Sequence, residues 1–166
     1  MRLHDDLLEL AVALSASESQ ASSRRSASTA YYALFHRLAF EAAQLFFPQT
    51  ADASLQAETV RALDHKTMKQ VCQWFSGTAT SSKPVRRLLG DTEIPKHLKD
   101  LSRAFIRIQE VRHEADYNVA GEIPASEARE MCAEAQAAFV VLDAGCDEPV
   151  YRIFLGSLLF ANSWRS

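Results

Sequence analysis

One long helical pattern, over residues 22–47, constrains the fold of this chain more than any other feature. Its apolar residues recur at steps of three and four, which is the spacing of one face of an α-helix. They are Ala27, Tyr31, Leu34, Phe35, Leu38, Ala42, Leu45 and Phe46. Pro48 then ends the pattern, because proline disrupts a helix interior. Turn residues are sparse, with only 5 Gly and 5 Pro in 166 residues, so the sequence predicts an all-α fold.

The same spacing predicts further helices along a single domain of residues 1–166. These helices are expected over residues 4–19, 58–75, 95–116, 124–144 and 150–161, with one short helical turn within 84–90. Residues 48–54 are predicted to form a loop, and Gly77 is placed as a C-terminal helix stop. Asp64 leaves an alternative open for the third helix, because it could cap a shorter helix that begins at His65.

The last predicted helix, over residues 150–161, is apolar on nearly all sides. Its apolar residues are Tyr151, Ile153, Phe154, Leu155, Leu158, Leu159 and Phe160. Such a helix should be buried, either on its own bundle or against a second subunit, and for this reason we expect a homodimer. The segment is too short to span a bilayer, so no membrane association is expected.

Charge is spread unevenly along the chain, whose net charge is −3. Residues 61–112 hold 11 Lys and Arg against 5 Asp and Glu, whereas residues 1–60 and 113–166 carry net charges of −3 and −6. The basic middle could be an electrostatic footprint for phosphate. Alternatively, basic and acidic helices could pack side by side and neutralise each other.

Common enzyme and metal-site motifs are absent from the sequence. The three cysteines, Cys72, Cys132 and Cys146, have no metal-like spacing, and no signal-peptide pattern precedes them, so we expect reduced thiols in the cytoplasm. There is no phosphate-binding glycine loop, no His-x-x-x-His pair and no serine nucleophile motif. Neither a cofactor nor a metal is therefore expected.

Arg112 interrupts an apolar stripe near the end of the predicted helix 95–116. The stripe runs through Leu98, Leu101, Phe105 and Ile108, and its next two positions are Arg112 and Ala115. A charge on a core-facing stripe is costly unless it is paired or functional. Asp116 lies four residues on and could pair with the arginine along the helix. With His113 and Tyr117 beside it, the arginine either closes the end of the bundle or binds phosphate next to an imidazole that can move a proton.

A second polar face is predicted on the helix at residues 22–47. It carries Arg24, Arg25, Tyr32 and His36, and the last two are neighbours because they are four residues apart. This face could be an ordinary solvated surface. Alternatively, Tyr32 and His36 could lie opposite Arg112 in the bundle and form one shared pocket with it.

Four segments of the chain carry a resemblance to a known superfamily. Residues 24–38, RRSASTAYYALFHRL, contain an Ala-Tyr-Tyr-Ala-x-Phe-His run, and residues 108–118, IQEVRHEADYN, contain Arg-x-x-Ala-Asp-Tyr. These resemble the second-helix signature and the late arginine motif of the HEPN superfamily (higher eukaryotes and prokaryotes nucleotide-binding domain). Residues 64–75 and 121–142 look like its His-initiated third helix and its closing helix, so the resemblance covers about residues 5–143.

The resemblance implies an up-and-down bundle of four to five helices, to which residues 150–161 add an apolar C-terminal helix. It also implies a homodimer with the arginine motif near a central cleft. Many HEPN proteins are metal-independent ribonucleases, including toxins of toxin–antitoxin pairs. Others are non-catalytic RNA- or nucleotide-binding modules that accompany a small nucleotidyltransferase.

This chain departs from the catalytic form of the motif at one position. Catalytic members carry an arginine, a polar residue, three further residues and then a histidine. Arg112 matches the arginine and His113 the polar residue, but Tyr117 stands where the final histidine is expected. The usual catalytic imidazole is therefore missing.

Three functions follow from these observations, and we favour the first. It is an HEPN-like module that binds RNA or a nucleotide without efficient catalysis. The binding residues are expected to be Arg112, Asp116, Tyr32, His36 and Arg25. The first alternative is a metal-independent ribonuclease, in which Arg112 stabilises phosphate charge and His113 or Tyr117 moves a proton. The second is a purely structural subunit that binds only protein.

Overall fold

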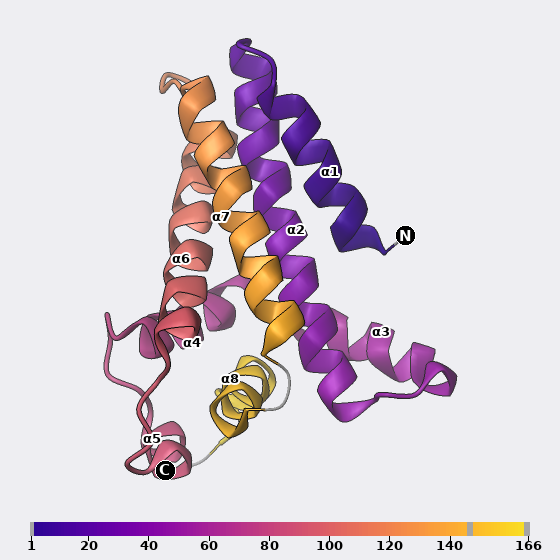
Figure 1. The fold of residues 1–166 in the computed structure, drawn as a ribbon, viewed down its shortest axis with the longest axis vertical. Coiled ribbons are helices and arrows are strands. Elements are labelled where there is room, and N and C mark those ends of the chain that lie inside the picture. The colour runs from indigo at the N-terminus through magenta and orange to yellow at the C-terminus, as the bar shows by residue number, and fades with distance from the viewer. Residues whose placement is uncertain (1, 146–147, 165–166) are drawn as a thin grey trace. The chain divides into compact units, whose positions relative to one another are not determined.

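The computed structural model describes residues 2–145 and 148–164, and every regular element in these ranges is a helix. The all-α prediction is therefore confirmed (Figure 1). The elements are α1 (Leu3–Ser15), α2 (Gln20–Phe46), the 3-10 helix η1 (Thr50–Asp52), α3 (Ala53–Ala62), α4 (His65–Ser76), α5 (Lys83–Leu89), α6 (Lys96–Tyr117), α7 (Ala125–Ala144) and α8 (Pro149–Phe160). Cys146 lies outside the described residues, whereas Cys72 and Cys132 are buried and free.

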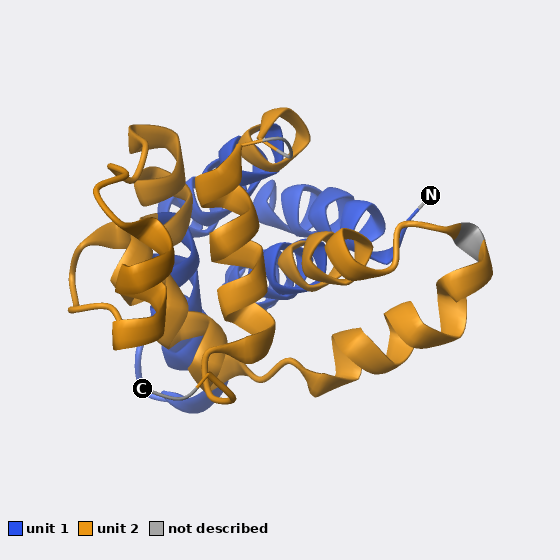
Figure 2. Ribbon diagram, turned by 90° about the horizontal axis from the view of Figure 1, so that it is seen from below, with its two compact units in different colours: residues 1–37, 104–140 blue, residues 38–103, 141–166 orange. Residues whose placement is uncertain are grey.

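The chain forms two compact units, each built from segments far apart in the sequence (Figure 2). The first unit contains the chain up to Arg37 together with residues 104–140, and the second contains residues 38–103 together with the chain from Val141 on. Helices α2, α6 and α7 each contribute residues to both units.

The first unit packs four helical segments around a core that α2 supplies in large part. Tyr31 is 1% exposed and its ring lies 5.7 Å, centroid to centroid, from that of the buried Phe105 on α6. Ser26 Oγ of α2 donates a hydrogen bond to the carbonyl oxygen of Ala11 on α1 at 2.8 Å, and it lies 3.4 Å from Cys132 Sγ on α7. Helix α2 therefore contacts the other three segments of its unit.

The second unit buries α8 against its own chain. Helix α8 packs on α4 and α5, and the rings of Phe75 and Phe154 meet edge to face at 5.1 Å. Tyr151, Phe154 and Leu158 are each at most 1% exposed. We predicted that this apolar helix would be buried either on its own bundle or against a second subunit. In the structure it is buried against helices of its own chain. The apolar surface of this helix, which led us to expect a homodimer, is thus explained by packing within one subunit.

The prediction of one helix over residues 58–75 is wrong, and the alternative with Asp64 as a cap is correct. Leu63 has an extended backbone, and Asp64 accepts hydrogen bonds from the backbone N–H of Thr67 at 2.8 Å and from its hydroxyl at 2.6 Å. A side chain that binds the third N–H of a helix starts a new helix there, because those donors have no partner in the preceding turn. Gly77, at φ 82°, ends α4 as predicted.

Helix α3 accounts for further differences from the prediction. It begins at Ala53, so residues 48–54 are not all loop, and η1 occupies Thr50–Asp52. No residue of α3 is buried. Periodicity could not separate α3 from α4, because the two helices are only two residues apart and their apolar positions continue in nearly the same register.

Several predicted helix ends move by a few residues for local reasons. Helix α1 ends at Ser15 rather than at residue 19, and α2 begins at Gln20, where Ser19 Oγ accepts a hydrogen bond from the N–H of Ser22. Helix α5 has seven residues, about two turns rather than one. The side of α1 that is buried carries His4, Ala11 and Ser15, whereas Leu10 is 50% exposed.

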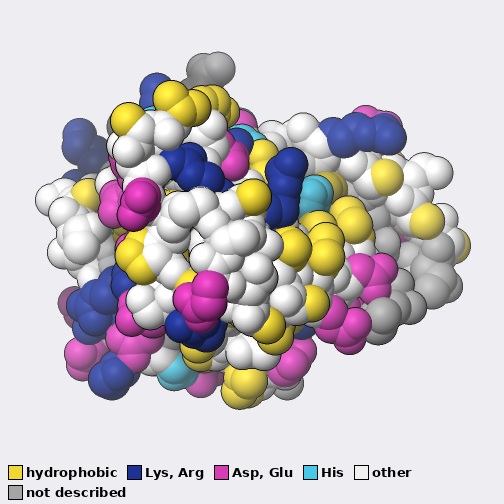
Figure 3. All heavy atoms as spheres, turned by 90° about the horizontal axis from the view of Figure 1, so that it is seen from above, with side chains coloured by type: hydrophobic (Ala, Val, Ile, Leu, Met, Phe, Trp, Pro, Cys, Tyr) yellow, Lys and Arg dark blue, Asp and Glu magenta, His cyan; other side chains and the backbone are white. Residues whose placement is uncertain are grey.

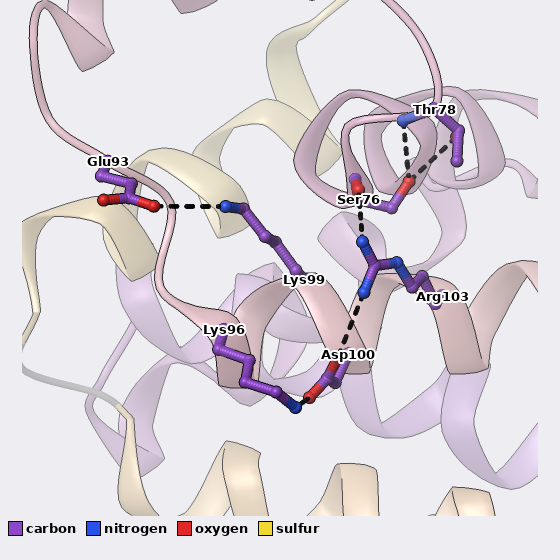
Figure 4. Close-up of polar contacts among 7 residues, drawn as sticks. All are labelled: Ser76, Thr78, Glu93, Lys96, Lys99, Asp100 and Arg103. Carbon is purple, nitrogen blue, oxygen red and sulfur yellow. Dashed lines mark hydrogen bonds and ion pairs between the residues drawn. The ribbon is translucent and has the colours of Figure 1, made fainter.

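Carboxylates pair with many of the basic residues in the middle of the chain. Lys96 and Arg103 both contact Asp100, and Lys99 Nζ lies 3.6 Å from Glu93 Oε1 (Figure 4). Arg61, Arg107 and Arg112 also form ion pairs. On the face shown in Figure 3, basic and acidic side chains are interspersed. Among these ion pairs, only those of Arg107, with Glu130 and Glu134 of α7, join two helices. The contacts therefore favour neutralisation over a broad phosphate footprint, but mostly within single helices rather than between helices packed side by side.

Replacing Asp64 tests the boundary between α3 and α4. We expect Asp64→Ala to lower the free energy of unfolding by about 1 kcal/mol, because the N-cap acceptor is lost. Asp64→Asn should retain most of the stability, since its amide oxygen can accept the same bond from Thr67. Urea unfolding followed by circular dichroism measures both variants. Equal loss in the two would contradict a capping role.

Buried His4 should make the stability of the first unit depend on pH. The side chain is 3% exposed and its ring lies 5.9 Å from that of Phe139. Burial lowers the pKa of His4, the charges of Arg37 and Arg2 lower it further, and Asp5 offsets this only in part. The unfolded chain then binds a proton more readily than the folded chain does. The free energy of unfolding should fall as pH drops below about 6.5 and level off below the folded-state pKa, by at most about 1.4 kcal/mol per pH unit.

The matched measurement uses the wild type and His4→Leu, unfolded in urea between pH 5 and pH 8. The wild type should lose more stability on acidification than the variant does, and the difference between the two curves isolates His4 from the other titrating groups. Parallel curves would show that His4 does not titrate differently on folding.

Candidate functional site

Arg112 is held between α2 and α6 in the first unit by two polar contacts. Its Nη2 donates a hydrogen bond to the hydroxyl of Tyr32 at 2.8 Å, and its Nε lies 2.8 Å from Asp116 Oδ2. The contact with Asp116 is an ion pair rather than a directed hydrogen bond. The side chain is 18% exposed, and Nη1 takes part in neither contact. The guanidinium is thus fixed in position, with one nitrogen not used by these partners.

Three tyrosine rings surround the guanidinium of Arg112. Its Cζ lies 5.7 Å from the ring centroid of Tyr31, 5.5 Å from that of Tyr32 and 5.3 Å from that of Tyr117. Cations within about 6 Å of an aromatic ring are attracted to the negative face of its π-system. The rings therefore stabilise the charge that interrupts the apolar stripe of α6.

The environment keeps Arg112 charged. Burial would lower the pKa of the guanidinium, but the hydrogen bond with Tyr32 and the electrostatic attraction of Tyr32, Asp116 and Tyr117 outweigh it, so the pKa is raised. Ser28 on α2 donates a hydrogen bond to Asp116 Oδ2 at 3.3 Å. The carboxylate that neutralises Arg112 is thereby tied to α2 as well as to α6.

His113 and Tyr117 form an exposed ring pair beside Arg112. Their centroids are 4.9 Å apart at an interplanar angle of 45°, as their spacing of four residues on α6 allows. Tyr117 is 63% exposed, and His113 is also exposed. A cation and an aromatic surface open to solvent therefore occupy the same end of α6.

Arg24 holds the C-terminal end of α6 from α2. Its Nη1 donates a hydrogen bond to the carbonyl oxygen of Ala115 at 2.7 Å, and its Nη2 donates to the carbonyl oxygens of Asn118, at 2.8 Å, and Gly121. The last carbonyl groups of a helix lack hydrogen-bond donors within the helix and carry partial negative charge. A guanidinium supplies both the missing donors and a compensating positive charge. Arg24 has a structural role, which the sequence did not distinguish from that of its neighbour Arg25.

The predicted site residues are only partly brought together. Arg112, Asp116 and Tyr32 are in direct contact, and His113 and Tyr117 adjoin them. Arg25 is exposed, and the ring of His36 meets that of Phe35 at 5.5 Å, so neither belongs to the contacts of Arg112. The polar side of α2 is not simply a solvated face, because Ser28 and Thr29 are buried.

Two contributors, Tyr31 and Ser28, were not identified from the sequence as site residues. Tyr31 was assigned to the core, where it is indeed buried, but its ring also faces the guanidinium. Ser28 carried no signal beyond its place on the polar side of α2. In the part of the chain that the structure describes, no three His, Cys, Asp or Glu side chains are grouped closely enough to hold a metal ion.

The chain was compared with protein-family models, with curated proteins and with solved structures, and none of them matched it. Among the described residues, no helix combines the length and the apolar character needed to cross a membrane.

Removing Arg24 should destabilise the protein, whereas removing its neighbour should not. We expect Arg24→Met to lower the free energy of unfolding by about 1–3 kcal/mol, because three carbonyl groups lose a charged donor. Arg25→Met is the matched control and should change it by less than about 0.5 kcal/mol, since the residue is exposed. Chemical denaturation of both variants makes the comparison, and equal effects would contradict the capping role.

Proposed function

We propose that this chain is an HEPN-like protein that binds RNA or a nucleotide at the end of α6 without efficient catalysis. One observation carries the proposal: a fixed guanidinium, Arg112, adjoins an exposed pair of aromatic rings, His113 and Tyr117. Single-stranded RNA is recognised by this combination, in which a cation contacts phosphate and aromatic side chains stack on bases.

Arg112 is the phosphate-binding group in this proposal. An arginine can donate to a phosphate oxygen through Nη1 while Nε and Nη2 keep their present contacts. Because Tyr32 and Asp116 already fix the side chain, little side-chain entropy is lost when a ligand binds. Asp116 reduces the local positive charge, so we expect modest affinity that is sensitive to salt.

The exposed rings supply the second part of the surface. Tyr117 presents most of its side chain to solvent and is braced by His113 on one side. Stacking of a base on such a ring contributes about 1–3 kcal/mol and tolerates any base. The proposal therefore predicts binding with little sequence preference.

Inefficient catalysis follows from the residue that replaces the expected histidine. A tyrosine hydroxyl is a poorer general base at neutral pH than the imidazole of a histidine. The ribonuclease alternative would depend on His113, which is exposed beside Arg112. A toxin–antitoxin setting, a small nucleotidyltransferase partner and a homodimer belong to the proposal only as expectations from the HEPN resemblance.

A structural role for Arg112 is the competing candidate, and one observation favours it. Both polar contacts of the guanidinium are made within the chain. The contact with Tyr32 links α6 with α2, and Asp116, which pairs with the arginine along α6, accepts a hydrogen bond from Ser28 of α2. Under this alternative, Arg112 closes the end of the first unit and nucleic acid is irrelevant to it.

The test measures the binding of a fluorescein-labelled single-stranded RNA by anisotropy at several salt concentrations. Arg112→Gln should weaken binding about tenfold, and the slope of log K against log salt should fall by about 1, because one phosphate contact is lost. Tyr117→Ala should also weaken binding, whereas Tyr117→Phe should not, because stacking needs the ring but not the hydroxyl.

Arg107→Gln is the matched control, because this arginine lies on the same helix but is paired with Glu130 and Glu134. It should leave RNA binding within about twofold of the wild type. Equal weakening by the Arg107 and Arg112 variants, or no binding by the wild type, would contradict the proposal. If Arg112→Gln leaves binding intact and lowers stability, the structural role is supported instead. RNA cleavage in the presence of a chelator that is lost in Arg112→Gln would establish the ribonuclease.

A further inference from the structure

A groove runs between α1 and α7 in the first unit, apart from the contacts of Arg112. Its volume is about 430 Å³. The residues that line it are Asp5, Leu8, Glu9, Val12 and Ala13 from α1 and Gln136 from α7. Helix α2 packs on both of these helices through Ser26, and α1, α2 and α7 are seen together in Figure 1.

The groove lies beside the face by which α1 packs on its unit. Asp5, Leu8, Glu9, Val12 and Ala13 are spaced by three and four residues, so they form one side of the helix. The packed side instead carries His4, Ala11 and Ser15, which are all buried. Val12 is 38% exposed, so apolar surface in the groove is open to solvent.

Gln136 is the residue of α7 that lines the groove. Gln136 shares one side of α7 with Ala133, Ala137 and Val140, because their spacing is three and four residues. All four are exposed, and Val140 is one of the most exposed large apolar residues of the unit. Exposed apolar surface of α7 therefore lies on the same side of the helix as the residue that lines the groove.

Acidic residues define the charge of the groove. Helix α1 contains Asp5, Asp6 and Glu9 but no Lys or Arg. Asp5 has a side chain that is 40% exposed, and Glu9 is exposed at the groove. An occupant must therefore combine apolar side chains with positive charge, and the acidic lining repels phosphate groups of nucleic acids and anionic lipids.

We propose that this groove docks an amphipathic helix of a partner protein, with apolar residues on one side and Lys or Arg along its edges. Laying an amphipathic helix into an apolar groove is a recurrent way of recognising a protein partner, and the apolar and acidic lining of this groove complements a helix with apolar and basic sides. This partner site is independent of the proposed RNA surface.

The test uses three synthetic 18-residue peptides labelled with fluorescein and the full chain. The first has leucines at helical spacing flanked by lysines, the second has glutamates in place of the lysines, and the third is a scrambled form of the first. We expect the first peptide to bind at least about tenfold more tightly than the other two, because only it matches both the groove's shape and its charge. Equal binding of the scrambled peptide would overturn the proposal.

Two variants locate the binding of the first peptide. Glu9→Lys reverses a charge at the groove and Val12→Lys places a charge on its apolar surface, so each should weaken binding about tenfold. Glu122→Lys is the matched control, because this acidic residue is exposed in the same unit but does not line the groove. Equal weakening by Glu122→Lys would show a response to net charge alone and overturn the proposal. Sedimentation of the chain alone completes the test: self-association abolished by Glu9→Lys would assign the groove to a second copy instead.

Discussion

The burial of one positive charge is the constraint on which the architecture of the first unit depends. Arg112 occupies a position in α6 whose neighbours along the stripe, Phe105 and Ile108, are fully buried. A guanidinium there is tolerated only because Tyr32, Asp116 and three aromatic rings replace the water that it loses. These partners come from both α2 and α6. The register between the two helices is therefore fixed by a polar cluster as well as by the apolar core.

Arg24 complements Arg112 at the same end of α6 but acts on the backbone. It reaches from α2 to the carbonyl oxygen of Ala115 in the last turn of α6, which has no donor within the helix, and to those of Asn118 and Gly121 beyond the helix end. The two arginines thus hold α6 by different means: Arg112 contacts side chains, whereas Arg24 binds main-chain oxygens. This leaves Tyr117 and His113, on the outer side of the same turns, exposed on a well-anchored helix end. A rigid helix end is a suitable place for a binding surface, since little ordering is needed when a ligand arrives.

Electrostatics differ between the proposed RNA surface and the groove on α1. The surface at α6 contains a cation that is partly neutralised by Asp116, whereas the groove is lined by carboxylates. Much of the basic charge in the middle of the chain is paired with nearby carboxylates, as at Lys96, Asp100 and Arg103. Paired charges produce only weak electric fields beyond about 8–10 Å at physiological salt. The charged groups at each of the two surfaces therefore act mainly on ligands bound at that surface.

The sequence by itself determined most of the helical segments and the anomaly at Arg112, although its periodicity did not separate α3 from α4. It also determined the pairing of Arg112 with Asp116 and the capping option at Asp64, because these interactions join residues three or four apart. Only the tertiary structure decided that Tyr32 meets Arg112, that Arg24 caps α6 while Arg25 stays exposed, and that α8 packs within its own chain. The physical reason is distance along the chain: Tyr32 and Arg112 are 80 residues apart. Periodicity shows which face of a helix is buried, but the packing of whole helices selects the residues that this face meets.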